Sequence, residues 1–420
     1  MDFTPGETQQ AIGRVAASVL GPPGTAGSRP AATGRPPAAG TPGREKRREQ
    51  AARHEHAGQQ AESGEGTRDA PTVPGPAEPA GGEPGFDAVT WKELGQAGLL
   101  SLALPDWLGG DGLGVLETTA VLTEIGARAA AVPALATLAL GVLPVTRWGD
   151  RAVQGALLAG VAAGDSVLTA GVREPGDPMP PVPATVVSAA GTVSGVKLGV
   201  PDAAAAAWLL VPASFAAGGT GVVIVDPAAH GVTLTAGPGT ARRECTVVLA
   251  DAPVSYVLGA QLPDRGTSGA VLGGLYQLAL AGACALADGA LAGALALTTA
   301  HLRTREQFGR PIATFQAAAQ HIADVYIAAR TLHLAAAAAC WQLSAGRDAG
   351  YDLDVAAHWL TEQAPAALRM CHHLHGGLGM DVSYPLHRYS SLVRDLTRFA
   401  GGADYRLDRL AVSACGPAAG

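Results

Sequence analysis

Apolar residues follow a helical period in two parts of the chain, and a different pattern lies between them. In "FDAVTWKELGQAGLL", which begins at Phe86, apolar residues recur three and four positions apart, as on the buried face of an amphipathic helix. The same period extends over residues 85–164, and it returns near Thr267 and continues through the region 263–415. A shorter amphipathic helix is predicted within residues 1–20.

Short runs of β-branched residues occupy the middle of the chain. "TGVVIVDPAAHGVTLT" and "CTVVLADAPVSYVL" are examples, and Gly, Pro and Asp bound the runs. We therefore expect a β-barrel or sandwich domain over residues 165–262. It would lie between an all-helical domain at 85–164 and a helical bundle at 263–415.

Residues 21–84 have a composition that cannot build a core. Val73 is the only large aliphatic or aromatic residue there, and Pro, Gly, Ala and charged residues supply most of the rest. Because so little apolar area can offset the ordering entropy, we interpret this stretch as a disordered insertion. Its basic run "REKRREQ" is closely followed by acidic residues, which disfavours binding to nucleic acid or membrane.

Composition narrows the function classes. The chain has 48 % hydrophobic and 15 % charged residues and a formal charge of −7, which predicts no nucleic-acid footprint. Its five cysteines are scattered without a CxxC pair, which favours a reducing cytoplasm over a disulfide framework or a zinc site. We expect no secretory signal, and no transmembrane helix, because polar residues interrupt the apolar run 271–300. The absence of a GxGxxG motif between a strand and a helix disfavours a Rossmann dehydrogenase.

The densest cluster of polar residues is "RTREQFGRPIATFQ", which begins at Arg303. Arg305 ends the long apolar helix, where its guanidinium offers fixed donors that match a pyrophosphate. Phe308 can cover a flat heterocycle, and Gln316 can hydrogen-bond one. An alternative interpretation is an ion pair of Arg305 with Glu306 at the helix terminus, with Phe308 in the core.

A second unusual segment is "CHHLHGGLGMDVSYPLHRY", which begins at Cys371. Its adjacent glycines, Gly376 and Gly377, indicate a close approach of the backbone to a ligand or to another helix. Three histidines precede them, but they lack the i, i+4 spacing of a helical metal site and no carboxylate accompanies them at that spacing. A metal site is therefore not favoured.

These segments resemble the acyl-CoA dehydrogenase family. "TREQFGRPIATFQAAAQHIAD" is similar to its flavin-contacting R-x-x-F-G-x-x-I-x-x-F-Q segment, and "HLHGGLGMDVSYPLHRY" to its Q-x-x-G-G-x-G-x segment. "WKELGQAGLLSLALPDWLGGDGLGVLETTAVLTEIG" resembles its N-terminal helical domain, so the similarity covers the chain apart from 21–84. The resemblance implies an acyl-CoA dehydrogenase-like fold, with an N-terminal all-α domain, a middle β-barrel or sandwich domain, and a C-terminal four-helix bundle.

The resemblance also implies FAD, bound in an extended form between subunits. In the family, one subunit's β-domain holds the isoalloxazine ring, and the neighbouring subunit holds the pyrophosphate and adenine side. The motifs assign the contacts with the pyrophosphate and adenine side to Arg305, Gln307, Phe308, Gln316, Gly376 and Gly377. His373 stands in place of the usual Gln.

The family's catalytic base has no counterpart in this chain. The family reaction removes two hydrogens from an acyl-CoA thioester, with a Glu taking the α-proton while the β-hydride passes to the flavin. Ala400, followed by Gly401, stands in the usual place of that Glu. The alternative place, on the helix 271–304, holds no Glu, and its sole acid, Asp288, lies one or two turns too far along.

This chain also differs from the family pattern in the half of the site that frames the flavin ring. Glu174 and Pro175 remain from its Thr/Glu-Pro loop, but Leu198, Gly199 and Val200 occupy the place of its Lys-x-Trp-Ile-Thr/Ser run. The resemblance therefore implies a chain that can donate the pyrophosphate half of an FAD site but not the ring half.

Within the family, this pattern resembles the smaller, base-less subunits of heterotetrameric (α2β2) actinobacterial acyl-CoA dehydrogenases, which act on steroid-CoA thioesters such as the cholesterol side chain. It implies a non-catalytic, FAD-contributing subunit whose paralogous partner carries the Glu, with acyl-CoA as substrate and an electron-transfer flavoprotein as acceptor. Two alternatives stay open. One is a self-sufficient homotetrameric enzyme with Asp404 or Asp395 as an atypical base, and the other is a flavin-less structural paralogue.

Overall fold

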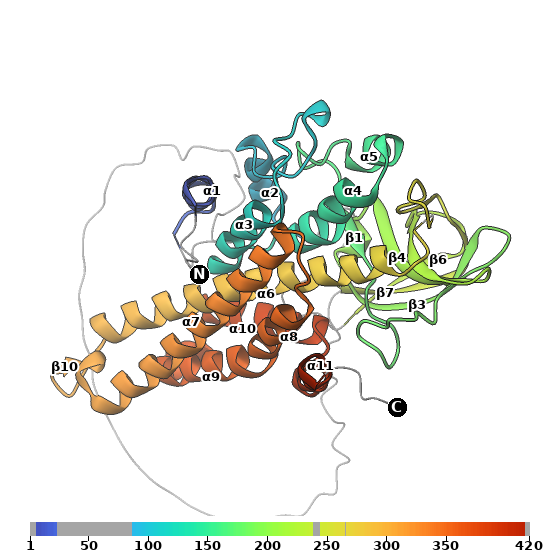
Figure 1. The fold of residues 1–420 in the computed structure, drawn as a ribbon. Helices are drawn as coiled ribbons and strands as arrows, with labels where there is room; N and C mark the ends of the chain where they lie inside the picture. Colours follow the sequence, from blue (N-terminus) through green and yellow to red (C-terminus); the bar gives the residue numbers. More distant parts are fainter. Residues whose placement is uncertain (1–5, 23–85, 238–243, 265, 416–420) are drawn as a thin grey trace, which may run out of the picture. The chain divides into compact units, whose positions relative to one another are not determined.

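The computed structural model describes residues 6–22, 86–237, 244–264 and 266–415, and these belong to one compact unit (Figure 1). Beyond Pro22, the insertion predicted at 21–84 lies outside the described residues. The described elements run from helices through strands and back to helices. This order confirms the fold predicted from the hydrophobic pattern.

Helices form the N-terminal part, and polar side chains mark where two of them begin. Asp87 accepts a hydrogen bond from the backbone N–H of Thr90 at 3.0 Å, and Asp150 accepts one from Val153 at 2.8 Å. Each carboxylate thereby satisfies a donor that the first helical turn leaves unpaired. The elements are α1 (Glu7–Leu20), α2 (Ala88–Gln96), the 3₁₀ turn η1 (Asp106–Leu108), α3 (Val115–Ala127), the π-helix η2 (Leu135–Val142), α4 (Leu143–Trp148) and α5 (Arg151–Leu158).

A mostly antiparallel sheet forms the middle domain. Its strand order is β6–β7–β3–β2–β4–β5–β8, and β1 pairs with β4 in parallel. Val223 and Val225 of β5 are buried, as the β-branched run of this strand predicts. The strands are β1 (Leu168–Ala170), β2 (Val186–Val187), β3 (Thr192–Pro201), β4 (Trp208–Phe215), β5 (Thr220–Val225), β6 (Val232–Ala236), β7 (Glu244–Pro253) and β8 (Tyr256–Val257), with the 3₁₀ turn η3 (Ala203–Ala205) before β4.

The C-terminal part is a helical bundle built around one long helix, α6. A short hairpin and a 3₁₀ turn connect α6 to α7, and a second 3₁₀ turn follows α9. The elements are α6 (Ala270–Thr304), β9 (Glu306–Gln307), β10 (Arg310–Pro311), η4 (Ile312–Thr314), α7 (Gln316–Ser344), α8 (Gly350–His358), the π-helix η5 (Trp359–Gln363), α9 (Ala364–His375), η6 (Gly376–Met380), α10 (Leu386–Phe399) and α11 (Ala403–Cys415).

Glycines allow α3 and α6 to pack backbone against backbone. A Cβ atom on Gly126 would lie 2.1 Å from the carbonyl oxygen of Leu286, and one on Gly289 would lie 1.8 Å from that of Thr123. No side chain fits at such distances. The most apolar stretch of α6 is 89 % buried. Although α6 and α7 are both long and apolar enough to cross a membrane, α6 is thus a core helix of the described unit.

The two ends of α6 adjoin different structures. Figure 1 shows the sheet beside the N-terminal end of α6, and the β9–β10 hairpin at the opposite end, where the chain turns into α7. With 35 residues, the helix is about 50 Å long at 1.5 Å per residue. The segment predicted to hold a pyrophosphate and the sheet predicted to frame a flavin ring therefore lie far apart in one chain.

Candidate cofactor and active site

A tight hairpin carries the first group of predicted cofactor residues. β9 and β10 are antiparallel, with Gln307 opposite Arg310. The turn residues Phe308 and Gly309 have φ angles of 52° and 76°, as in a two-residue type I′ turn. A bulky residue is unfavourable at such an angle, and the Phe308 side chain is also 92 % exposed. A strained and exposed aromatic residue fits a contact with a molecule outside this chain.

Arg305 and Gln316 flank the hairpin, and both side chains are exposed. The backbone N–H of Arg305 donates to the carbonyl of His301 at 2.8 Å, which closes the last turn of α6. Among the described residues, Arg305 and Glu306 form no ion pair, and Phe308 is outside the core. The alternative interpretation of this segment, a helix-terminal ion pair beside a core aromatic, is therefore wrong.

The second predicted segment lies next to the hairpin. Leu302, Ala318 and Leu374 form a small buried cluster that joins α6, α7 and α9. The rings of His301 and His375 stack with 4.5 Å between their centroids. The structure therefore brings together, at one end of the bundle, two segments that are far apart in the sequence.

Open space surrounds the predicted glycines. A Cβ atom on Gly376 or Gly377 would meet no other atom within 4 Å, so packing within the chain does not require glycine at either position. The φ angle of 57° at Gly376 does favour it. His373 is exposed beside them, with its ring centroid 5.6 Å from that of His321. A large polar ligand can thus approach this backbone closely.

Two histidines hold the loop that follows α9, and sequence reasoning missed this role. Nδ1 of His372 donates to the carbonyl of Gly379 at 2.8 Å, and its Nε2 accepts from the hydroxyl of Ser390 at 2.6 Å. Nε2 of His375 accepts from the hydroxyl of Tyr384 at 3.0 Å, and burial lowers the pKa of His375. The partners come from other elements, and the sequence carried no signal for them.

Ala400, the residue in the expected place of the base, is fully buried at the C-terminal end of α10. Its carbonyl oxygen accepts a hydrogen bond from Nε of Arg406 at 2.5 Å. Arg406 is itself buried and lies 3.5 Å from a carboxylate oxygen of Asp354. Burial lowers the pKa of the Arg406 guanidinium. The residue in the expected place of the base therefore offers no carboxylate, and a buried cation contacts its backbone.

The carboxylates considered as atypical bases are poorly placed. Asp395 is buried, and its carboxylate accepts a hydrogen bond from Arg398 at 2.9 Å. Asp404 is exposed in the first turn of α11. A general base needs a dry pocket and reach to the substrate carbon, and neither residue has both. Asp288 pairs with His333 at 2.9 Å and lines a separate cavity.

A buried ion pair fixes the segment after β1 to β3. Nζ of Lys197 lies 2.5 Å from Oε1 of Glu174, which also accepts a hydrogen bond from the Thr185 hydroxyl at 2.6 Å. Burial lowers the pKa of Lys197 to about 8, although the charge of Glu174 opposes this. Burial also disfavours ionisation of Glu174, but the charge of Lys197 and the hydrogen bonds outweigh it, so that pKa lies below its ordinary value. The Glu174 carboxylate thus has a structural role in the fold.

Charged side chains fill the space beside Gly199, where the family carries a Trp-containing run. A Cβ atom on Gly199 would lie 3.0 Å from Nη1 of Arg173 and 3.3 Å from Oε2 of Glu244. Nη2 of Arg398 donates to the same Glu244 oxygen at 3.0 Å. The φ angle of Gly199 is 57°, which also disfavours a side chain. A large aromatic residue is therefore disfavoured at this position.

Comparison with known proteins decides the family. Residues 276–414 match "Acyl-CoA dehydrogenase, C-terminal domain", and residues 73–165 match "Acyl-CoA dehydrogenase, N-terminal domain". The chain is 45 % identical over 323 residues to acyl-CoA dehydrogenase FadE28 of Mycobacterium tuberculosis, which covers 77 % of this chain and 91 % of that protein. This chain belongs to the acyl-CoA dehydrogenase family. It is also 35 % identical to acyl-CoA dehydrogenase FadE27 of the same organism, over 77 % of this chain and 87 % of that protein.

Solved structures of acyl-CoA dehydrogenases share the fold. The steroid ACAD Tcur3481–Tcur3483 aligns with a TM-score of 0.72 and 33 % identity, over 79 % of this chain and 89 % of that chain. The ChsE4–ChsE5 complex from Mycobacterium tuberculosis aligns with a TM-score of 0.76 and 27 % identity, over the whole of both chains. The family consists of oxidoreductases, and FAD is its cofactor.

The two halves of the family's FAD site fit this chain differently. The exposed donors around the hairpin and the open backbone at Gly376 and Gly377 suit the phosphate and adenine side. At the sheet, the Arg173 and Glu244 side chains crowd Gly199, which stands where the family has a ring-framing residue. The chain thus has the acyl-CoA dehydrogenase fold, and its two site halves differ in the residues that they present.

Proposed function

We propose that this acyl-CoA dehydrogenase chain is the non-catalytic, FAD-contributing subunit of a heteromeric enzyme. A paralogous chain would carry the catalytic Glu and the pocket for the flavin ring. The observation that carries the proposal is the fully buried Ala400, which stands in the family's place for the Glu and carries no carboxylate. The enzyme would α,β-desaturate an acyl-CoA thioester.

The chain's own residues would bind and orient the cofactor. Arg305 and Gln307 would donate hydrogen bonds to phosphate oxygens, and Phe308 would cover a flat part of the molecule. The backbone at Gly376 and Gly377 would allow close approach. When bound, FAD accepts the hydride, and the proton would be taken by the partner's carboxylate. The length of α6 supports this division, because one chain's hairpin cannot reach its own sheet.

The surface of α7 supports a stable association with another chain. Only 33 % of the most apolar stretch of this helix is buried within the described unit. Tyr326, Ile327 and Leu334 are exposed along it. Contiguous exposed apolar area of this kind is typical of a surface that another protein covers. We assign it to the paralogous subunit, in a heterotetramer of α2β2 type.

The proposed substrate is a steroid side-chain CoA thioester. The likeness to Tcur3481–Tcur3483, which is described as a steroid ACAD, supports this class. In this chain, the cavity beside Arg406 and Tyr276 measures only about 290 Å³, below the range of about 300–1,000 Å³ common for ligand pockets. The steroid would therefore bind in the partner's site. We further propose a cytoplasmic enzyme reoxidised by an electron-transfer flavoprotein.

Expression of the chain alone and with a paralogue that carries the Glu tests the proposal. We expect colourless, inactive protein from the single chain and a yellow, active complex from the pair. Turnover of an acyl-CoA by the chain alone would contradict it.

The cofactor contacts are tested in the complex with Arg305→Ala. We expect this change to lower the flavin content, because a phosphate donor is lost. Arg303→Ala is the matched control, since it removes the same charge from an exposed residue two positions earlier. Equal flavin content in both variants and in the unaltered complex would favour the flavin-less paralogue.

A further inference from the structure

A second cavity lies between α1, α3, α6 and α7, away from the hairpin. Its volume is about 660 Å³, within the range of small-molecule pockets, about 300–1,000 Å³. Asp288 on its wall precedes Arg305 by 17 positions of α6, which is about 25 Å along the helix. The cavity is therefore distinct from the proposed cofactor site.

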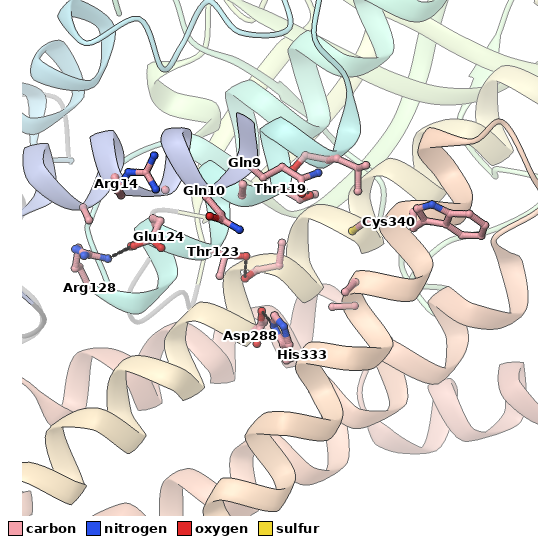
Figure 2. A pocket seen from close by; sticks show the side chains of 18 residues that line it. Gln9, Gln10, Arg14, Thr119, Thr123, Glu124, Arg128, Asp288, His333 and Cys340 are labelled. Carbon is pink, nitrogen blue, oxygen red and sulfur yellow. Dashed lines mark hydrogen bonds and ion pairs between the residues drawn. The ribbon is translucent and has the colours of Figure 1, made fainter. Parts of the chain in front are cut away.

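Figure 2 shows Asp288 of α6 and His333 of α7 side by side, with Gln10 and Arg14 of α1 on another wall. Nδ1 of His333 lies 2.9 Å from Oδ2 of Asp288. The hydrogen bond with Asp288 raises the pKa of His333, against the effect of burial. Among the described residues, Oδ1 of Asp288 and Nε2 of His333 have no further hydrogen-bond partner. The pair therefore offers one acceptor and one ring nitrogen to a ligand.

Thr123, Glu124 and Arg128, three other polar residues of the lining, are already engaged. The hydroxyl of Thr123 donates to the carbonyl of Ala285 at 3.2 Å. Arg128 pairs with Glu124 and donates to the carbonyl of Gly21 at 2.7 Å. The apolar part of the lining includes Ala17, Leu116, Ala120, Ala336, Ala337 and Trp341. Next to the Asp288–His333 pair, a ligand would thus meet apolar side chains of α3 and α7, whereas Gln9, Gln10 and Arg14 lie on the α1 wall.

The charges of the lining are mostly paired. Arg128 pairs with Glu124, and a protonated His333 pairs with Asp288, whereas Arg14 lies exposed on the wall formed by α1. At the Asp288–His333 pair, an anionic head would meet the like charge of Asp288, and a cationic head would meet that of a protonated His333. A hydroxyl group can instead donate to Oδ1 of Asp288 and hydrogen-bond Nε2 of His333.

We propose that this cavity binds an uncharged, mostly apolar alcohol, whose hydroxyl group meets Asp288 and His333. The inference does not depend on the FAD contacts or on the missing base. A failure of the proposed function would therefore leave it standing, and the reverse is also true.

Three ligands of equal chain length test the head group. 1-Octanol, octanoate and octylammonium are titrated by calorimetry into the full-length protein, in the form in which it is purified. We expect saturable binding of octanol, at least about tenfold tighter than either ion, a difference of ~1.4 kcal/mol. Tighter binding of octanoate or octylammonium, or no saturable binding of octanol, would overturn the proposal.

Two substitutions on α7 test whether octanol binds in this cavity. Ala337 lines the cavity and Ala338 does not, and both are half-buried. Ala337→Trp should weaken octanol binding at least about tenfold, whereas Ala338→Trp should leave it within about twofold. Equal effects of both would show that octanol binds elsewhere. His333→Phe is a further check, because it removes the ring nitrogen without filling the cavity as a Trp would. It should remove the preference for octanol over the ions.

Discussion

Nε of Arg406 donates to the carbonyl oxygen of Ala400 at 2.5 Å, inside the described core. Nη2 of the same guanidinium lies 3.2 Å from Sδ of Met179, so the side chain joins α11, the end of α10 and the segment after β1. Ala400 itself is fully buried and does not line the cavity beside Arg406. Its surroundings are packed around a different residue.

Restoring the carboxylate should therefore not restore activity. Ala400→Glu places a longer, charged side chain at a fully buried position, and such overpacking costs about 1–3 kcal/mol. We expect a lower urea midpoint and no acyl-CoA-dependent reduction of a dye by the isolated chain, because Gly199 still lacks the ring-framing residue. Leu407→Glu, at an exposed position of α11, is the control and should leave the midpoint nearly unchanged. Activity of Ala400→Glu alone would refute this explanation.

The buried pair of Glu174 and Lys197 should behave as a structural unit. Lys197→Met leaves the Glu174 carboxylate buried without its partner, which costs about 3–5 kcal/mol. The double variant Lys197→Met/Glu174→Gln removes both charges, so we expect it to be more stable than Lys197→Met. Urea unfolding of the three proteins measures the differences. A double variant that is no more stable than Lys197→Met would argue against coupling.

Local patterns in the sequence predicted the order of the elements and the segments that we expect to contact the cofactor. A helical period and β-branched runs depend on neighbouring residues, so the change near residue 165 and the return of helices near Thr267 were visible. Phe308 and Gly376 were found because their motifs are contiguous. The contacts around Gly199 were not visible, because Arg173, Glu244 and Arg398 come from three separate parts of the chain and meet only in the fold.

The pair of His333 and Asp288 predicts a pH-dependent contribution to stability. The hydrogen bond with Asp288 raises the pKa of His333 in the folded state, and Arg330 opposes this weakly. The stabilisation is therefore fully present below the unfolded-state pKa of about 6.5 and is lost as pH rises through the folded-state value. The stability lost in His333→Gln should be larger at about pH 5.5 than at about pH 8.5 in urea unfolding. A loss that is equal at both pH values would contradict the assignment.

We expect Phe308 to lower the stability of the chain and to strengthen cofactor binding. Asn tolerates a positive φ angle better than Phe, so Phe308→Asn should stabilise the isolated chain by up to about 1 kcal/mol. The same change removes the exposed ring, and it should lower the flavin content of the complex. Thermal unfolding and the ratio of flavin to protein absorbance measure the two effects. Phe308→Leu keeps the strain and loses the ring, so it should lower flavin content without a gain in stability.

The close approach of α3 and α6 can be tested by two identical substitutions on one helix. Gly289→Ala places a Cβ atom 1.8 Å from the carbonyl oxygen of Thr123, whereas Gly273→Ala places one where no atom lies within 4 Å. Both changes gain the same helix propensity, about 0.8–1 kcal/mol, so their difference isolates the contact between the helices. We expect Gly273→Ala to stabilise the chain and Gly289→Ala to destabilise it by at least about 2 kcal/mol in urea unfolding. If Gly289→Ala were the more stable of the two, α3 and α6 could not pack backbone against backbone.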